Sequence, residues 1–527
     1  MSEMLLRDLL DNQARNKPNE LAYLCGDKSI TWSKLNNRAN QIGAVLQKLG
    51  HTPGQPVGIV APETIEVYEH FYACFKVGAI RVGINRRFTA KEALHMVDDG
   101  NLKLLFAHVD CMPLVKQMEN ELAKRNVIVI GMGAGHGLEL DFETLINECD
   151  QDIVYPNLSN DDPAMYSYTS GTTGLPKGVV LSARALKVVI EQAPLNLGFV
   201  PEDRFYCPLA NAWAAVLFNL LGVSNGMTLV IPDKEYDTKE FLNEIEEKSI
   251  SVFLLAPTMM QWAVDALSDM DVNTDGVRLG IYGSAPAAPK LIKEASQIFG
   301  CNLVQAYGVS EAAAGWISYL SAEDHIKGLD SKPEILQSAG RAPSYFSVSV
   351  RDEDGIELPT GQTGELWVKS DTLMTEYLNL PEQTEEVLKD GWLVTNDMAV
   401  IDKDGYIFLK DRRKFMIVTG GINVFPAGVE AIMSDHPAIK EIAAVGVPHA
   451  VWGEAVIAVV YTDGDTQTSA EELIGFCEGK LSKVMTPKYV HFTDKPLPKS
   501  ANLKIQKHII KDWFVSDPSL LPEKFQG

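Results

Sequence analysis

The sequence lacks the patterns that mark metal-stapled, secreted or membrane-spanning chains. Its 527 residues include seven cysteines, all widely spaced and none in a CxxC pair. This odd count disfavours a structural zinc site and favours a reducing compartment. The longest apolar stretch, 212–223, contains Asn219 and is shorter than the ~20 residues that span a bilayer. The N-terminal segment has no basic region followed by an apolar core, so no signal peptide is expected. We therefore expect a soluble cytoplasmic protein without integral membrane association.

Positive charge is also scarce. The chain has 47 lysines and arginines against 70 aspartates and glutamates, which gives a formal net charge of −23. A field of that sign repels nucleic acids and anionic membranes, so neither is an expected partner. An anionic substrate would need locally placed amides, lysine, arginine or Mg²⁺, although the charge can equally serve solubility alone. Hydrophobic residues make up 46%, which is ordinary for globular proteins, and the length requires at least two domains.

Short apolar runs alternate with helix-like segments before residue 310. The runs are 57–61, 102–108, 127–131, 227–232, 251–257, 279–285 and 303–308, and the helix-like segments include 237–248 and 289–299. Strands that alternate with helices indicate βαβ units and largely parallel sheets, which is an α/β fold. Ligands of such sheets bind beyond the carboxyl ends of the strands. The loops after 279–285 and 303–308 are therefore candidate sites.

The pattern changes past residue 345. Residues 348–370 are typical of antiparallel strands joined by Asp-Gly and Thr-Gly turns, and they predict a small β-barrel-like part. A charged stretch at 410–414 follows. Beyond it, a small α+β unit is expected from the strands 442–447, 455–462 and 489–493 and from a helix between Ser469 and about Leu481. We place a domain boundary at the charged stretch, although it could also be an ordinary surface loop.

The strongest local motif is the stretch 166–178, YSYTSGTTGLPKG. Three glycines, four hydroxyl side chains and one lysine follow one another between Thr169 and Gly178. Such a loop can surround a polyphosphate with amides, hydroxyls and a cation, although most loops of this composition are ordinary turns. It is not a Walker A loop, since GxxxxGK[ST] is absent. We expect a strand–loop–strand hairpin, with Ser182 capping the helix that begins at Ala183.

This motif resembles the phosphate loop of the adenylate-forming superfamily, which contains acyl-CoA synthetases, luciferases and peptide-synthetase adenylation domains. Further blocks of that family follow in the same order over nearly the full chain, at 282–286, 305–311, 391–397, 411–414, 420–426 and 497–505. The resemblance implies a large N-terminal adenylation domain over 1–410, a hinge at 411–414 and a mobile C-terminal domain over 415–527. It also implies ATP, Mg²⁺ and coenzyme A as cofactors or co-substrates.

The resemblance further implies a role for each block. Catalytic roles fall to Lys504 between the attacking carboxylate and the α-phosphate, to Glu311 as the Mg²⁺ ligand, and to Thr169 and Lys177 on the phosphates. The phosphate loop adds Ser170, Gly171, Thr172, Thr173 and Gly174. The adenine side includes Gly283, Ser284, Ala285, Pro286, Ala306, Tyr307, Gly308 and Ser310. Asp397 and Arg412 would bind the ribose, Lys414 would be the hinge residue, and Gly420 and Gly421 would line the path of the thiol.

The acyl pocket of related enzymes follows a block that reads PLANAWA at 208–214 in this sequence. Asn211 replaces a frequent histidine or aromatic residue, Trp213 supplies a flat wall, and Ala312 begins a run of small residues. No aspartate stands where amino-acid-activating relatives bind the α-amine. A neutral apolar acyl or aryl chain therefore fits best. The alternative is that these alanines only pack the core.

An acyl-CoA synthetase is the preferred interpretation. The first alternative is a stand-alone ligase that loads a separate carrier protein, and the second is an inactive relative used for binding or scaffolding. The motifs do not distinguish an acyl-CoA synthetase from a luciferase-like oxygenase. They also specify neither the acid nor whether the chain forms a homodimer. Five departures from the family pattern bear on rate and substrate class: Ser310 for Thr, Asn396 for Gly, Phe415 for Asp, Gly428 for Glu and Leu503 for Gly.

Overall fold

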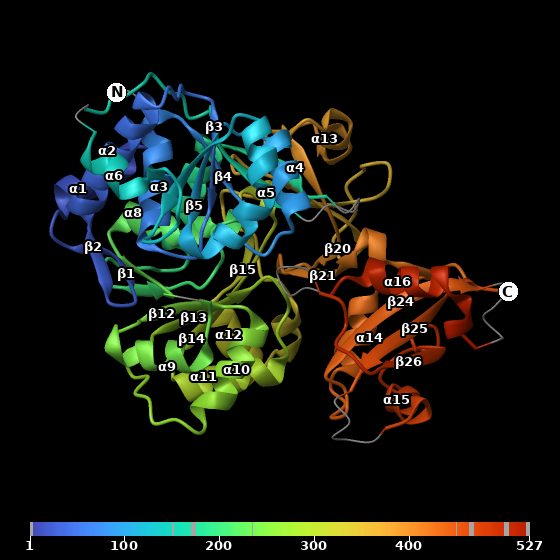
Figure 1. Ribbon diagram of the computed structural model, residues 1–527. Helices are drawn as coiled ribbons and strands as arrows, with labels where there is room; N and C mark the ends of the chain where they lie inside the picture. Colours follow the sequence, from blue (N-terminus) through green and yellow to red (C-terminus); the bar gives the residue numbers. More distant parts are fainter. Residues whose placement is uncertain are drawn as a thin grey trace. The chain divides into compact units, whose positions relative to one another are not determined.

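The computed structural model of this chain describes residues 4–149, 152–169, 175–233, 235–449, 451–462, 468–499 and 505–522, apart from the side chain of Lys414. Backbone packing divides the chain into two units (Figure 1). The first unit is made of Met1–Val348 and Val368–Val394, and the second of Ser349–Trp367 and Thr395–Gly527. The domain boundary predicted at 411–414 marks an expected hinge, which this division by packing does not test, so it stays a prediction.

The first unit contains a sheet of eight strands in the order β15-β14-β13-β12-β10-β11-β1-β2. Its strands are β1 Leu21–Cys25, β2 Lys28–Thr31, β10 Arg204–Tyr206, β11 Thr228–Ile231, β12 Val252–Leu255, β13 Leu279–Gly283, β14 Asn302–Gly308 and β15 Trp316–Leu320. The inner strands pair in parallel, and β2 and β15 close the two ends in antiparallel. Four buried residues make up β12, as expected for a strand covered on both faces.

A second sheet of the first unit also has eight strands, in the order β18-β9-β8-β4-β3-β5-β6-β7. The strands are β3 Pro56–Val60, β4 Ile80–Gly83, β5 Leu104–His108, β6 Ile128–Met132, β7 Leu140–Asp141, β8 Pro163–Thr169, β9 Lys177–Ser182 and β18 Glu376–Tyr377. In this order, neighbouring strands from β8 through β4, β3, β5 and β6 to β7 pair in parallel. The pairs β8–β9 and β9–β18 are antiparallel. The largely parallel α/β architecture expected from the sequence is therefore confirmed.

Helices connect these strands, and Figure 1 shows α9 to α12 gathered around β12, β13 and β14. The helices of the first unit are α1 Asp8–Asn16, α2 Trp32–Lys48, α3 Ile65–Val77, α4 Ala90–Asp99, α5 Met112–Lys124, α6 Phe142–Asn147, α7 Ala183–Asn196, α8 Gly222–Asn225, α9 Thr238–Glu247, α10 Pro257–Leu267, α11 Pro289–Phe299, α12 Ala322–Asp330 and α13 Pro381–Val387. As predicted, the Ser182 hydroxyl caps α7 by accepting a hydrogen bond from the Ala185 amide. No helix within the described ranges combines the length and apolarity needed to cross a membrane.

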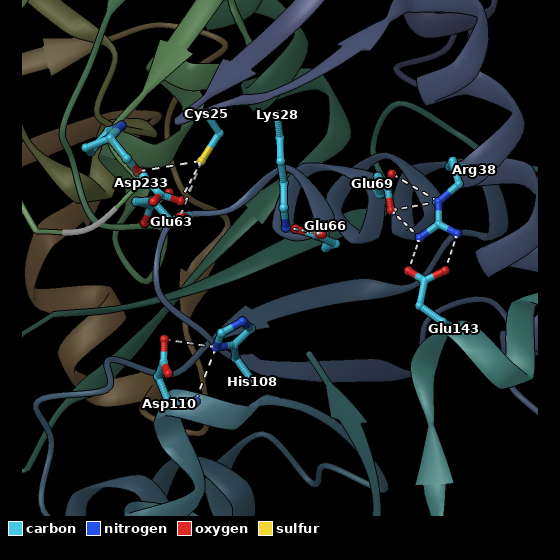
Figure 2. Close-up of polar contacts among 11 residues, drawn as sticks. Cys25, Lys28, Arg38, Glu63, Glu66, Glu69, His108, Asp110, Glu143 and Asp233 are labelled. Atoms are coloured by element: carbon cyan, nitrogen blue, oxygen red, sulfur yellow. Dashed lines mark hydrogen bonds and ion pairs between the residues drawn. The ribbon is translucent and has the colours of Figure 1, made fainter. Parts of the chain in front are cut away.

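Two ion-pair groups join helices of the first unit. The guanidinium of Arg38 bonds both Glu69 and Glu143, which joins α2 to α3 and α6 (Figure 2). Lys76 is fully buried, and its ammonium lies 2.6 Å from Oδ1 of Asp11 on α1. Because an unpaired buried charge is costly, these pairs fix the terminal helix and α2 on α3.

The antiparallel strands expected past residue 345 are present. They are β16 Ser347–Arg351, β17 Thr363–Lys369, β19 Leu388–Lys389, β20 Trp392–Ile401 and β21 Ile407–Arg412. These strands form a five-stranded sheet in the order β16-β17-β20-β19, in which β21 also pairs with β20.

The C-terminal part of the second unit is the expected small α+β fold. Its strands are β22 Ile417–Thr419, β23 Ile422–Val424, β24 Glu441–His449, β25 Gly453–Tyr461 and β26 Tyr489–Thr493, and its helices are α14 Pro426–Met433, α15 Ala470–Phe476 and α16 Lys507–Ser516. Successive residues of β25 alternate between two apolar clusters, so the sheet is covered on both faces. The predicted helix to about Leu481 is wrong at its end, since α15 stops at Phe476 and Gly479 takes a left-handed φ of 74°.

Candidate active site

The predicted phosphate hairpin is formed by β8 and β9. Thr169 lies directly opposite Lys177 in the antiparallel pair, so these two residues close the base of the loop. Ser170, Gly171, Thr172, Thr173 and Gly174, which were predicted to bind phosphate, lie outside the described residues. The strand–loop–strand arrangement expected from the sequence is confirmed.

The two blocks predicted to contact adenine lie side by side. In the parallel pair of β13 and β14, Gly283 stands opposite Ala306, so the loops after both strands emerge at one edge of the sheet. A Cβ atom on Gly283 would lie 2.6 Å from the carbonyl oxygen of Ala306, so this position requires glycine. The loop after Gly283 is solvent-exposed, and Tyr307 on the neighbouring strand β14 is half-buried. The exposed loop residues are Ser284, Ala285 and Pro286.

Glu311 lies in a short 3-10 turn, Ser310–Ala312, directly after β14. The chain then folds back through Ala313 and Ala314, both with positive φ, into β15. Gly308 makes this return possible, because a Cβ there would lie 2.5 Å from the carbonyl oxygen of Gly315. The turn holds the Glu311 carboxylate half-buried at the carboxyl end of β14.

Tyr377 on β18 contacts two of the predicted catalytic residues. Its hydroxyl donates a 2.8 Å hydrogen bond to Oε1 of Glu311. The ammonium of Lys177 lies 5.6 Å from the centroid of its ring. The structure therefore brings Glu311 and Lys177 together around one tyrosine, although they come from different sheets.

These residues fit a Mg²⁺-bound triphosphate. Mg²⁺ in nucleotide sites is held by one or two carboxylates together with phosphate oxygens and water. Glu311 offers a carboxylate with one oxygen, Oε2, to which no described residue donates a hydrogen bond. Lys177 adds a cation near the ring of Tyr377, at the base of a loop rich in hydroxyls and glycines. Such a donor set suits a metal that shares its ligands with phosphates.

Asp397 and Arg412 form an ion pair in the second unit. Nε of Arg412 lies 2.9 Å from Oδ1 of Asp397, and the two residues stand opposite each other on β21 and β20. The Asp397 side chain is 10% exposed and that of Arg412 48% exposed. Asn396, which replaces the glycine of the family pattern, has a φ of 61°. Asparagine tolerates this left-handed region better than most residues, so the departure keeps the local backbone.

A polar cluster surrounds the predicted hinge. Oδ2 of Asp411 accepts a hydrogen bond from the Ala427 amide at 2.9 Å. The ammonium of Lys507, on α16, lies 3.7 Å from Asp411 and 2.9 Å from Oε2 of Glu430, and 5.5 Å from the Phe415 ring centroid. Burial raises the pKa of Glu430, and the ammonium of Lys507 partly opposes that effect. The side chain of Lys414, the predicted hinge residue, and all of Lys504 lie outside the description.

The predicted thiol path contains the tip of the β22–β23 hairpin. Gly420 and Gly421 have φ values of 58° and 78°, a left-handed turn that glycine adopts without strain. The Gly420 amide donates to the carbonyl of Trp452 at 2.8 Å. Both glycines are exposed.

The predicted acyl-pocket residues differ in their surroundings. Asn211 is buried, and its amide donates to Oε1 of Glu63 and to the carbonyl of Ala61, while its oxygen accepts from Arg81. Figure 2 shows Glu63 beside Cys25 and Asp233. The polar atoms of Asn211 are therefore used within the protein.

The two other predicted pocket residues are apolar. The half-buried Trp213 packs edge-on against Phe88, with ring centroids 5.9 Å apart. Ala312 is fully buried.

Tyr377, Glu63 and Arg81 are the residues that sequence reasoning missed. Tyr377 contacts a residue 66 positions away, and Glu63 contacts one 148 positions away. Neither contact has a local motif that could have revealed it. The fully buried arginine in the strand 80–83 is the one local signal, since a charge in a buried strand calls for partners.

Two protein-family models match this chain. The model of the AMP-binding enzyme family matches residues 10–378, and the model of the AMP-binding enzyme C-terminal domain matches residues 428–504. A fatty acid–acyl-carrier-protein ligase of Streptomyces coeruleorubidus is 29% identical over 96% of this chain and 95% of its own length. A long-chain-fatty-acid–CoA ligase of Mycobacterium tuberculosis is 29% identical over 96% of this chain and 98% of its own.

Solved structures agree with these matches. The o-succinylbenzoate CoA synthetase of Bacillus subtilis, in complex with an acyl-adenylate intermediate, is 25% identical over 97% of this chain and 99% of its own, with a TM-score of 0.84. The fatty acyl CoA synthetase of Mycobacterium tuberculosis is 27% identical over 97% and 98%, with a TM-score of 0.76. Because the first family match alone spans well over half of the 527 residues, this chain belongs to the AMP-binding enzyme family, within the adenylate-forming superfamily.

Proposed function

We propose that this protein activates a carboxylic acid with ATP and then transfers the acyl group to the thiol of coenzyme A. In the first step a carboxylate oxygen attacks the α-phosphorus, the bond to the bridging oxygen breaks, and pyrophosphate leaves. In the second step the thiol sulfur attacks the carbonyl carbon, AMP leaves, and the thiol proton is released. Both half-reactions would use the same bound adenylate.

The arrangement of Glu311 and Lys177 around Tyr377 carries this proposal. Attack of a carboxylate on a triphosphate brings two anions together, so the rate depends on neutralising the charge that develops. A carboxylate that can hold Mg²⁺ and a lysine at the base of a hydroxyl-rich loop contact the same tyrosine. Mg²⁺, when held by Glu311, would supply positive charge that lowers this repulsion.

The remaining predicted residues complete the proposed site. In our proposal, the Asp397 carboxylate accepts hydrogen bonds from the ribose hydroxyls, and Arg412 holds that carboxylate and adds a donor. Tyr307 stacks on the adenine. Lys504 neutralises the attacking carboxylate and the α-phosphate, and rotation about Lys414 then removes it and admits the thiol along Gly420 and Gly421.

The proposed substrate is a neutral acid with an apolar acyl or aryl chain. Trp213 offers an aromatic face, and Ala312 adds no polar atom. The polar atoms of Asn211 are engaged by Glu63, Ala61 and Arg81, so they favour no charged group on the substrate. Relatives named for long-chain fatty acids and for ferulic acid support the same class.

Loading of a carrier protein is the second candidate function. One full-length relative is a fatty acid–acyl-carrier-protein ligase, and it is as similar to this chain as the coenzyme A ligases are. The adenylation step would be the same, and the thiol would come from the phosphopantetheine arm of a separate protein.

A panel of fatty and aryl acids tests the proposal. Purified protein with ATP and Mg²⁺ should release pyrophosphate with at least one acid in the absence of any thiol. Addition of coenzyme A should then give an acyl-CoA detected by mass spectrometry. A product found only with a phosphopantetheinylated carrier would support the second candidate. No pyrophosphate with any acid of the panel would contradict adenylation and favour a binding or scaffolding role.

A further inference from the structure

We propose that Tyr377 is a positioning residue that aligns Glu311 with Lys177 for the Mg²⁺-bound nucleotide. This inference rests on the proposed function and adds to it a residue outside every motif that identifies the site. Tyr377 would act through its two neighbours rather than on the reacting atoms.

The side chain of Tyr377 makes one contact with each partner. Its hydroxyl donates to Oε1 of Glu311 at 2.8 Å, and its ring lies 5.6 Å from the ammonium of Lys177. A hydrogen bond to Oε1 restrains rotation of the carboxylate and engages one acceptor site of that oxygen. The other oxygen, Oε2, accepts no hydrogen bond from any residue in the described ranges, and it remains for a metal ion.

The main chain around Tyr377 joins the two halves of the site as well. The Thr375 amide donates to the Val180 carbonyl at 3.0 Å, and the Leu378 amide donates to the Gly178 carbonyl at 2.7 Å. These bonds attach β18 to β9 immediately after Lys177. The Met374 amide donates to the carbonyl of Glu311 at 2.7 Å. Residues 374–378 therefore hold Glu311 by its main chain and its side chain while they pair with the phosphate hairpin.

Tyr377 is itself held in place. Its amide donates to Oγ1 of Thr384 at 2.9 Å, and that hydroxyl donates to the Leu380 carbonyl. Asn379 follows with a φ of 56°, and its amide group bonds the carbonyl and Oδ1 of Asp99 at 3.0 Å. A side chain fixed in this way can impose its position on its neighbours, which is what a preorganised site requires.

The two contacts of Tyr377 predict different effects on nucleotide binding. Loss of the hydroxyl frees the Glu311 carboxylate to rotate and should weaken binding only when Mg²⁺ is present. Loss of the ring should also release the Lys177 ammonium, which meets the phosphates with or without the metal. A purely structural tyrosine would affect binding equally in both conditions.

Isothermal titration of ATP, with and without Mg²⁺, separates these effects in the full-length protein. We expect Tyr377→Phe to raise the Kd of Mg²⁺-ATP about tenfold, as for a lost hydrogen bond to a charged group, and to leave the Kd of metal-free ATP unchanged. Tyr377→Leu should add a loss of about threefold in both conditions, as for a lost cation–π contact. The thermal unfolding midpoint of Tyr377→Phe should match that of the unsubstituted protein.

Tyr155 provides the matched control. Its hydroxyl donates to Oδ1 of Asn40 at 3.1 Å, and the ammonium of Lys76 lies 5.5 Å from its ring centroid, so it also combines a hydroxyl hydrogen bond, here to a neutral amide, with a cation–π contact. Tyr155→Phe should leave both Kd values unchanged. If Mg²⁺ changed the Kd of ATP by the same factor in Tyr377→Phe as in the unsubstituted protein, the role of Tyr377 would be overturned, and the proposed function would stand. Failure of the unsubstituted protein to bind ATP would overturn the proposed function and this inference together.

Discussion

Nε of Arg412 lies 2.9 Å from Oδ1 of Asp397, between opposing residues of β21 and β20. The carboxylate is nearly buried and the arginine is half-exposed. The ion pair restrains the direction in which this carboxylate can accept hydrogen bonds. Two hydroxyls on neighbouring carbons, as in a ribose, are suitable donors to it.

Asp397→Asn should weaken ATP binding about tenfold, because an amide accepts hydrogen bonds less strongly than a carboxylate. Isothermal titration calorimetry measures the change. Asp161→Asn is the control, since Asp161 pairs with Nε of Arg184 at 2.8 Å on an exposed surface. Equal affinities for the Asp397 and Asp161 variants would contradict the ribose assignment.

Lys504→Ala should reduce adenylate formation by about 10² or more, because the variant loses the cation that we propose stabilises charge in the transition state. The same variant should still convert a supplied acyl-adenylate to the thioester, since the proposed mechanism uses this lysine only in the first half-reaction. Pyrophosphate release and thioester formation are followed separately. An equal loss in both half-reactions would show that this lysine has another role.

Asn211→Ala should lower the free energy of unfolding by about 1–3 kcal/mol, because the buried guanidinium of Arg81 and the carbonyl of Ala61 lose the bonds that the Asn211 side chain makes, while Oε1 of Glu63 keeps the main-chain amide of residue 211. Urea unfolding measures the effect. Asn196→Ala is the control, since that exposed side-chain amide bonds the Gln192 carbonyl one turn earlier in the same helix, and its change should stay within about 0.5 kcal/mol. If the Asn211 variant had unchanged stability but an altered preference among acids, the result would show that this residue lines the acyl pocket and does not mainly stabilise the fold.

His51 predicts a loss of stability in acid. Burial lowers the pKa of His51 to about 4. Between that value and the ordinary pKa of about 6.5, the unfolded chain binds a proton that the folded chain does not, so stability falls as the pH falls. The contribution across this window is up to ~3 kcal/mol. His51→Gln should flatten the dependence of urea midpoints on pH between 7 and 4.5, and an unchanged slope would contradict this account.

The sequence predicted the parts of the site that depend on local pattern. The hairpin of β8 and β9, the Ser182 cap, α11 and the strands β13 and β14 all follow from periodicity, glycine positions and capping residues within short windows. These signals act over a few residues, so one sequence is enough to read them.

Contacts between distant residues could not be predicted in this way. The bond from Tyr377 to Glu311 depends on β18 joining the edge of a sheet whose next strand lies almost two hundred positions earlier. The engagement of Asn211 by Glu63 depends equally on how two segments pack. The Asn396 substitution raised a doubt that only its φ of 61° answers.

The division of the first unit between two stretches of chain has a consequence for synthesis. Residues 349–367 belong to the second unit, and β18 belongs to the first. The ribosome must therefore synthesise a segment of the second unit before it synthesises β18, which completes the sheet of the first unit. Until Tyr377 emerges, a nascent chain exposes β9 as a bare edge, open to pairing with other chains. A stop codon in 349–367 would make that exposure permanent, because β18 would never be synthesised.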